Sequence, residues 1–429
     1  MTMWLEEQLS ALCRIVGGGT PSRQNPRFWH GRIPWASVKD FKEGERFINQ
    51  TEESITEAGL ASSASRLIPA GTPLICTRMA VGRSALSVHE IAINQDVKAL
   101  CPNDKVSGDY LQRLLQHYRR ELERIAIGST VKGISTGDLL RLQVIYPQES
   151  DEQVDIANVL DAADSAIRKT EAVIGKLRQI KIGFLHDLLN FGVNEYGHVR
   201  DPIRFPEQFQ QSAIGSFPNT WTIEPLSKLL TGIDAGDSPS CPNYPAPAGE
   251  WGILKVSAVT NEGFVPSENK HLENARHVSQ TLAVRQGDLL ITRCNTPELV
   301  GAACLVDQAP PPLLLCDKTL RLLLNPKRDD PRYVLHALRM PQVRRQIEIS
   351  ATGSSGSMKN ISQNDIRGYL IPRPPTEEQR LIACKIGLIE ARIAAELEQL
   401  SKAQALKAGL AHDLLTGTVR VPITASVPA

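Results

Sequence analysis

Apolar residues recur at alternating steps of four and three along two stretches of the chain, residues 151–189 and 377–415. Each stretch is long enough for a helix of about 40 residues, or roughly 60 Å. The apolar stripe consists of Ile156, Leu160, Ala163, Ile167, Ile174, Leu177, Phe184 and Leu188 in the first stretch, and of Ile382, Ile386, Ile389, Ile393, Leu400, Ala403, Leu410 and Leu414 in the second. This spacing is typical of helices that wind around a partner helix. We therefore predict two coiled-coil helices that pair with each other, with packing of each helix on its own globular unit as the alternative.

The two stretches are copies of one another at a constant offset of 226 residues. Identical pairs are Gln153 with Gln379, Ile156 with Ile382, Ala157 with Ala383, Ile167 with Ile393, Lys181 with Lys407, Gly183 with Gly409, and the HDLL runs at 186–189 and 412–415. Upstream segments match through small gaps, Thr77-Arg78 with Thr292-Arg293 and the run from Lys132 with the run from Lys359. The whole chain is therefore a tandem duplication of a globular unit followed by a long helix.

Short apolar runs bounded by glycine, proline and polar residues predict strands and loops in the globular units. Each unit also has one helical stretch, expected over Tyr110–Ile127 in the first and Tyr333–Ile349 in the second. The predicted fold class is α+β: two tandem mixed α/β domains at residues 1–150 and 191–375, with coiled-coil helices at 151–190 and in 376–429. If the helices pair antiparallel, the chain is pseudo-two-fold symmetric, and the helices act as a spacer of fixed length.

Composition excludes several classes of protein. No apolar run reaches the ~18–20 residues of a membrane span, and Glu6 and Glu7 stand where a secretory signal needs basic and apolar residues. We therefore expect a cytoplasmic protein. The eight cysteines form no C-x-x-C pair, so neither a zinc site nor a disulfide framework is indicated, and reduced, mostly buried cysteines are expected. A net charge of +1 lacks the basic excess of most free-standing nucleic-acid binders, but it fits a subunit that shares DNA binding with partners.

No catalytic motif stands out in the chain. An adenine methyltransferase would need an [N/D]-P-P-[Y/F] motif for the flipped base, and an ATPase would need a G-x-x-x-x-G-K-[S/T] loop. Neither occurs in the sequence. We expect a non-catalytic protein without cofactor or metal.

Three sequence features together resemble the specificity subunits of type I restriction-modification systems. These are the opening GGGTPSR…IPWASVKD at residues 17–40, a proline shortly before the Glu-Gln pairs at 152–153 and 378–379, and the HDLL helix ends. The resemblance covers nearly the whole chain. It implies that two target-recognition domains each read one half of a bipartite, asymmetric site in double-stranded DNA. It further implies that the helices fix the spacer and dock two methyltransferase subunits, and that restriction subunits, which are ATP-dependent translocases and nucleases, join this core.

The second unit lacks the GGGTPSR opening, since Thr231–Gly236 and a proline-rich loop stand there, which leaves open whether both units hold DNA with the same loop. Specific reading of DNA needs side chains at base edges and contacts to phosphates. In loops that follow predicted strands and helices, the candidates are Lys39, Thr77, Arg78, Arg83, Ser129 and Lys132 in the first unit, and Lys255, Arg293, Asn295, Lys318, Ser355 and Lys359 in the second. The arginines of the two helical stretches are either phosphate contacts or exposed surface charges.

A second hypothesis is a non-catalytic coiled-coil scaffold that holds two protein-binding domains apart and does not bind DNA. The near-zero net charge favours the scaffold, whereas the opening residues and the full-length duplication favour DNA reading. The salt dependence of DNA binding distinguishes the two, because phosphate contacts weaken steeply with ionic strength.

Overall fold

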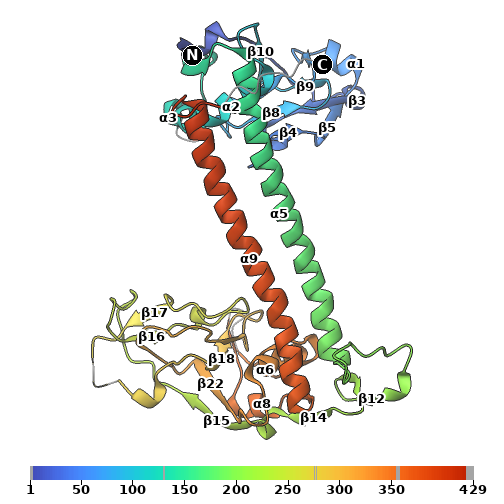
Figure 1. The fold of residues 1–429 in the computed structure, drawn as a ribbon, viewed down its shortest axis with the longest axis vertical. Helices are drawn as coiled ribbons and strands as arrows, with labels where there is room; N and C mark the ends of the chain where they lie inside the picture. Colours follow the sequence, from blue (N-terminus) through green and yellow to red (C-terminus); the bar gives the residue numbers. More distant parts are fainter. Residues whose placement is uncertain (1–2, 129–130, 275, 277, 354–357, 422–429) are drawn as a thin grey trace. The chain divides into compact units, whose positions relative to one another are not determined.

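The computed structural model describes residues 3–128, 131–274, 276, 278–353 and 358–421. The chain divides into two compact units (Figure 1). Unit 1 comprises Met1–Val173 with Glu396–Ala429, and unit 2 comprises Ile174–Ala395. Each unit therefore combines one sheet-rich domain with part of each of two long helices, α5 (Ser150–Phe191) and α9 (Thr376–Leu415).

The domain of unit 1 has two mixed sheets and a peripheral strand pair. One sheet has the order β2 (Cys13–Gly17), β10 (Val97–Pro102), β7 (Pro73–Cys76), β8 (Ser84–Ser87) and β4 (Phe47–Ile48). The other has the order β5 (Glu53–Ile55), β3 (Trp29–Ala36), β9 (Ile91–Ile93) and β6 (Leu67–Ile68), and β1 (Trp4–Gln8) pairs with β11 (Gln143–Pro147). The helices are α1 (Glu57–Ala61), α2 (Gly108–His117), α3 (Arg119–Ile125) and α4 (Thr136–Leu140). Strands β7 and β8 are buried at every position, which explains the continuous apolar run of β7.

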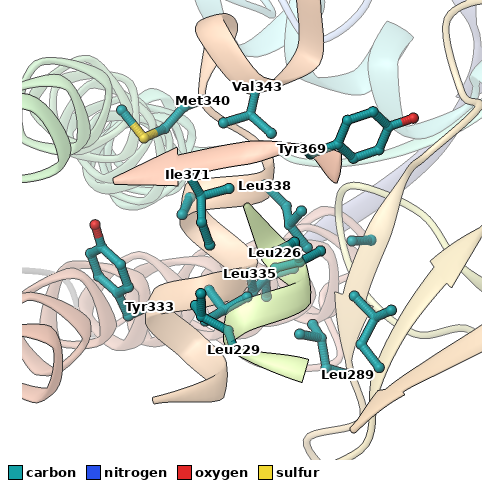
Figure 2. Packing of buried hydrophobic residues seen from close by; sticks show 14 of the residues in the cluster. Leu226, Leu229, Leu289, Tyr333, Leu335, Leu338, Met340, Val343, Tyr369 and Ile371 are labelled. Carbon is teal, nitrogen blue, oxygen red and sulfur yellow. The ribbon is translucent and has the colours of Figure 1, made fainter. Parts of the chain in front are cut away.

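The domain of unit 2 repeats this plan with one strand fewer in each of its two sheets. Its main sheet has the order β15 (Leu230–Ala235), β22 (Thr319–Leu324), β18 (Leu289–Thr292) and β20 (Ala303–Leu305), and a second has the order β17 (Asn269–His271), β16 (Gly252–Leu254) and β21 (Leu313–Leu314). Strand pairs are β14 (Thr222–Pro225) with β24 (Leu370–Arg373), β19 (Cys294–Asn295) with β23 (Lys359–Asn360), and β12 (Phe209–Ser212) with β13 (Gly215–Pro218). The helices are α6 (Pro331–Leu338), α7 (Pro341–Ser350) and α8 (Gln363–Gly368). Figure 2 shows Leu335 and Leu338 of α6 packed among buried residues from the strands and from α7.

The two helical stretches of the domains are each split in two, which the sequence patterns did not predict. In unit 1 the break falls at Tyr118, whose hydroxyl accepts a hydrogen bond from the Ile145 amide at 3.2 Å. In unit 2 it falls before Pro341, which has no amide hydrogen to continue the ladder of α6 and begins α7 instead. The prediction of one continuous helix in each unit is therefore wrong.

The predicted fold class is confirmed, and the long helices pack through the predicted apolar stripe. In unit 1, Ile156 and Leu160 near the start of α5 share a core cluster with Leu414 near the end of α9. In unit 2, Leu188 near the end of α5 shares a cluster with Ile386 near the start of α9. Because early residues of one helix meet late residues of the other, the helices are antiparallel within each unit.

Two ion pairs of identical design interrupt the apolar stripe. In unit 1, Lys407 of α9 binds Asp164 of α5 at 2.5 Å, and in unit 2, Lys181 of α5 binds Glu390 of α9 at 2.7 Å. The lysines are equivalent in the duplication, and so are the acids. The polar positions that break the stripe therefore satisfy each other between the helices, which favours one register over others.

A buried glutamine attaches the start of each long helix to its domain. The Gln153 amide donates to the carbonyls of Lys105 at 2.8 Å and Pro147 at 3.0 Å, and its oxygen accepts from the Ser107 amide at 3.2 Å. Ser107 is the residue that caps α2. Gln153 therefore joins the long helix α5 to strand β11 and to the start of helix α2.

Gln379 makes the equivalent contacts in unit 2. It donates to the Pro374 carbonyl at 2.9 Å and accepts from the amide of Asp330, the capping residue of α6, at 2.9 Å. The neighbouring acids are duplicated as well, since Glu152 binds Arg420 and Glu378 binds Arg200. In each unit, the segment that follows one long helix is thus tied to the first turn of the other.

Candidate nucleic-acid interface

Four loops of the first domain form one connected surface, which we call loop group 1: residues 18–22, 77–82, 94–96 and the described part of 126–134. The backbone links three of them, since the Thr77 amide donates to the Asp96 carbonyl at 2.8 Å and the Ile134 amide donates to the Thr77 carbonyl at 2.9 Å. The Thr20 hydroxyl reaches Gln95 Oε1 at 2.5 Å and joins the fourth. The candidates Arg78 and Lys132 therefore lie on one surface.

The second domain carries an equivalent loop group 2: residues 236–240, 293–301, 316–318 and the described part of 351–361. Here the Arg293 amide donates to the Lys318 carbonyl at 2.9 Å, and the Ile361 amide donates to the Arg293 carbonyl at 2.9 Å. The Ser238 hydroxyl bonds to Asp317 as Thr20 bonds to Gln95. The same backbone scheme thus brings Arg293, Lys318 and Lys359 together.

The opening loop of the first unit has a counterpart in the second after all. A Cβ atom on Gly18 would lie 2.0 Å from the Ile93 carbonyl oxygen, and one on Gly236 would lie 1.9 Å from the Leu315 carbonyl oxygen. Both glycines are therefore required for the same close approach of loop to strand. The run G-D-S-P-S at 236–240 corresponds to G-G-T-P-S at 18–22, so both domains present this loop.

When the sheets of the two domains are aligned, the equivalent residues are shifted by one position from the sequence match of Thr77-Arg78 with Thr292-Arg293. Cys76 pairs with Val97, and Thr292 pairs with Thr319, at equivalent places in the two sheets. Arg293 therefore occupies the position of Thr77, and Cys294 occupies that of Arg78. Because neighbouring strand residues point to opposite faces, this shift decides which side chains face outward.

Most of the candidate residues lie at or near the surface, but two are turned inward. Lys39, Arg78, Lys132 and Lys318 are exposed, and Lys255, Arg293, Asn295 and Lys359 are half-buried. Thr77 is buried and its hydroxyl donates to the Asp96 carbonyl at 3.0 Å, while Arg83 donates to the Phe41 carbonyl at 3.1 Å and binds Glu43. Ser129 and Ser355 fall outside the described residues. Thr77 and Arg83 thus support the loops, whereas the lysines and Arg78 are accessible.

Lys39 and Lys255 lie apart from the loop groups in the fold of each domain. They follow β3 and β16, which belong to the second sheet of each domain rather than to the sheet that carries the loops. Lys39 lies 3.7 Å from Glu52. These two lysines therefore stand as separate candidates.

The arginines of the domain helices fall into two classes. Arg113 is buried and binds Asp161 and Asp164 of α5, so it attaches the domain to the long helix. Arg344 donates to the Val300 carbonyl at 2.7 Å and supports loop group 2. Arg120 and Arg345 are exposed. Sequence patterns did not separate the structural arginines from the accessible ones.

Comparison with known proteins supports the resemblance seen in the sequence. Residues 1–179 match the family model of the type I restriction modification DNA specificity domain. The chain is 32% identical over 163 residues to the EcoEI specificity subunit of Escherichia coli, covering 38% of this chain and 27% of that protein. It is 31% identical over 190 residues to the EcoR124I/EcoR124II specificity subunit of Escherichia coli, covering 42% of this chain and 46% of that protein. These matches thus span less than half the length of either relative.

Longer but weaker similarities cover most of the chain. The putative MjaX specificity subunit of Methanocaldococcus jannaschii is 25% identical over 329 residues, which is 75% of this chain and 71% of that protein. The solved S subunit of the type I system of M. genitalium superposes with a TM-score of 0.56 at 13% identity, covering 96% of both chains. A chain from a structural study of assembly and conformational transition of the type I system superposes with a TM-score of 0.59 at 15% identity, covering 97% of this chain and 98% of that one. Most of the chain is therefore similar in sequence to type I restriction-modification specificity subunits, residues 1–179 match the DNA specificity domain of that family, and the fold is that of solved S subunits.

Proposed function

We propose that the chain is the specificity subunit of a type I restriction-modification complex and performs no chemistry itself. Each domain reads one half of a bipartite, asymmetric site in double-stranded DNA and directs adenine methylation and restriction by partner subunits. The observation that carries this proposal is the duplication of the loop group: both domains build it with the same backbone hydrogen bonds, and the first lies within the match to a DNA specificity domain.

The accessible residues of the loop groups suit both parts of DNA recognition. In the first domain, Arg78 can bind a guanine edge in bidentate fashion and Lys132 can bind phosphate. In the second, Asn295 suits adenine, and Lys318 and Lys359 suit phosphate. Ser129 and Ser355 belong to the same proposal by their place in the sequence, as do Lys39 and Lys255, while Thr77 and Arg83 hold the loops in place.

The long helices are proposed to set the spacer between the half-sites and to dock two methyltransferase subunits, which restriction subunits join in the cytoplasm. The apolar stripe is buried or half-buried, yet Ile182, Leu388 and Leu406 on the same helices are 65–70% exposed. Such apolar positions outside the helix–helix contact suit a protein partner. Among the described residues, no helix is both long and apolar enough to cross a membrane.

The first experiment is to map methylated adenines in the host genome with and without the gene. Loss of one bipartite motif on deletion is expected, whereas an unchanged methylome would count against the proposal and favour the scaffold hypothesis. Replacing residues 1–150 with the corresponding domain of a relative should change one half of the motif. A hybrid that altered both halves, or neither, would refute independent reading by the two domains.

The scaffold hypothesis makes a different prediction for binding in solution. A DNA-reading subunit loses affinity steeply with salt because its phosphate contacts release counterions. We therefore expect the affinity for target DNA to fall by a factor of ten or more between about 50 and 200 mM salt. A protein-binding scaffold would show no specific DNA affinity at either salt concentration.

A further inference from the structure

Met79 at the tip of loop group 1 has an unusual backbone conformation. Of the residues that the structure describes, two that are not glycine have positive φ, His30 at 61° and Met79 at 63°. A side chain in this region of φ costs conformational energy, which proteins retain mainly where the geometry has a use. The Met79 amide donates to the Lys132 carbonyl at 3.1 Å, so the strained residue is held by the neighbouring loop.

The strained backbone presents an apolar side chain to solvent. Met79 is 68% exposed, and Ile127 and Val131 of the neighbouring loop are 81% and 45% exposed. The Ile127 backbone makes two 2.9 Å hydrogen bonds with Gly133, so this loop is also anchored. Three apolar side chains thus stand on a supported surface without covering one another from water.

Positive charge is in slight excess around this apolar tip. Met79 and Lys132 line a hollow of about 250 Å³ together with Arg83, Arg119 and Glu123; both arginines bind Glu43, and Arg119 also binds Glu123. The exposed Arg78, which precedes Met79, lies 3.7 Å from Asp96, whereas the exposed Lys132 has no ion-pair partner among the described residues. Apolar side chains next to the exposed cations Arg78 and Lys132 favour a ligand that carries anionic groups beside apolar ones. Duplex DNA has this character, because phosphates flank a groove in which each thymine exposes a C5 methyl group.

We propose that Met79 is a specificity-determining residue that contacts a thymine methyl group in the half-site read by the first domain. The inference rests on the proposed function and names the chemistry that one residue reads. Lys132 positions the loop on a phosphate, Arg78 reaches a neighbouring guanine edge, and the φ of Met79 directs its thioether chain toward the thymine. In loop group 2, Cys294 and Asn295 occupy the positions of Arg78 and Met79. The second domain therefore reads its half-site by other contacts.

The test removes the methyl group from the DNA and the thioether from the protein separately. The full chain, assembled with its methyltransferase subunits, is titrated with duplexes carrying its bipartite motif, in which deoxyuridine replaces one thymine at a time. For the wild-type protein, one such replacement in the first half-site should weaken binding about fourfold, the value of one buried methyl group. The Met79→Ala variant should bind the unmodified duplex correspondingly weaker and should not respond to that replacement.

Two further variants separate base contact from loop support. Met79→Leu keeps an apolar side chain and should keep the response to deoxyuridine. Ile203→Ala removes a side chain that is 91% exposed in unit 2 and should behave as wild type. Equal thermal stability of Met79→Ala and wild type is expected because the side chain is exposed.

The outcomes separate this inference from the proposed function. A wild-type protein without a preference for any bipartite site would contradict the proposed function. If the wild-type protein prefers one bipartite site but the Met79→Ala variant still responds to the deoxyuridine replacement, only the role of Met79 is overturned. A first half-site without thymine would do the same.

Discussion

Replacing Gln379 with leucine should detach α9 from the second domain without disturbing the first. The side chain is fully buried, accepts from the Asp330 amide at 2.9 Å and donates to the Pro374 carbonyl at 2.9 Å. Leucine is similar in volume but leaves the Asp330 amide and the Pro374 carbonyl without a partner; it also removes the 3.5 Å hydrogen bond to the Arg328 carbonyl, which Thr376 still binds. Each stranded group costs about 1–3 kcal/mol, so we expect a loss of about 2–6 kcal/mol in the free energy of unfolding of unit 2.

The duplication provides a matched variant in the other unit. Gln153→Leu removes three hydrogen bonds, to Lys105, Pro147 and Ser107, and should cost at least as much in unit 1. Gln179 is exposed on α5, so Gln179→Leu should change the free energy of unfolding by less than about 0.5 kcal/mol.

Hydrogen exchange resolved by mass spectrometry, combined with urea unfolding, measures the effect in each unit separately. For Gln379→Leu, the amides of α6 and the first turns of α9 should exchange faster, while those of α2 should keep wild-type rates. Gln153→Leu should show the reverse. A loss below about 0.5 kcal/mol in both variants, or equal acceleration in both units, would refute the view that these glutamines hold domain and helix together.

Three other perturbations test separate features. Burial lowers the pKa of His336 to about 4, below its unfolded value of about 6.5, so unit 2 should lose up to about 3 kcal/mol between pH 6.5 and 4, and His336→Gln should flatten this dependence in urea titrations. Although burial raises it, the Lys407 hydrogen bond and the charge of Arg113 hold the pKa of Asp164 below its usual value; this carboxylate should therefore destabilise unit 1 only as the pH falls below about 4, and Asp164→Asn should remove that contribution. Gly18→Ala should cost about 1–3 kcal/mol by overpacking against the Ile93 carbonyl, whereas Gly175→Ala, with no atom nearby on α5, should be neutral or stabilising in thermal melts.

The parts of the fold that depend on periodicity could be predicted from the sequence. A stripe with steps of four and three has one geometric solution, a long helix packed along that stripe, and Ile156, Leu160 and Ile386 are buried where the stripe placed them. The repeated Gln153 and Gln379 marked the start of each helix. Their hydrogen bonds could not be predicted, because the partner carbonyls of Lys105, Pro147 and Pro374 lie in loops and at strand ends whose placement the spacing does not specify.

The opening strand of the second domain shows what a search at one constant offset misses. Trp4-x-x-Glu7-x-Leu9 and Trp221-x-x-Glu224-x-Leu226 are copies separated by 217 residues, and they begin the equivalent strands β1 and β14. The loops within the second domain are longer in total by nine residues, so the offset rises from 217 at this strand to 226 at the long helix. A search that allows gaps would have found this match, and with it the opening of the second domain.

The candidate site was predicted as loops more successfully than as residues. Whether a side chain faces DNA or the core depends on a register of one residue, as Thr77 and Arg78 show, and sequence spacing alone did not settle it. Gly71 and Gly287, which both have positive φ just before the equivalent strands β7 and β18, would have set the register correctly.

The duplication has preserved the attachment of each domain to the helices while the outward-facing loops have diverged. Gln153 and Gln379 make equivalent contacts. Asp96 and Lys318, by contrast, have side chains of opposite charge at equivalent positions, since their carbonyls accept hydrogen bonds from the equivalent amides of Thr77 and Arg293. Because side chains of opposite charge stand at this equivalent position, the two loop groups are not expected to make the same contacts with bases. A chain with such domains is therefore expected to read two different half-sites. A methylated motif with identical halves would contradict this reasoning, even if the chain bound DNA as proposed.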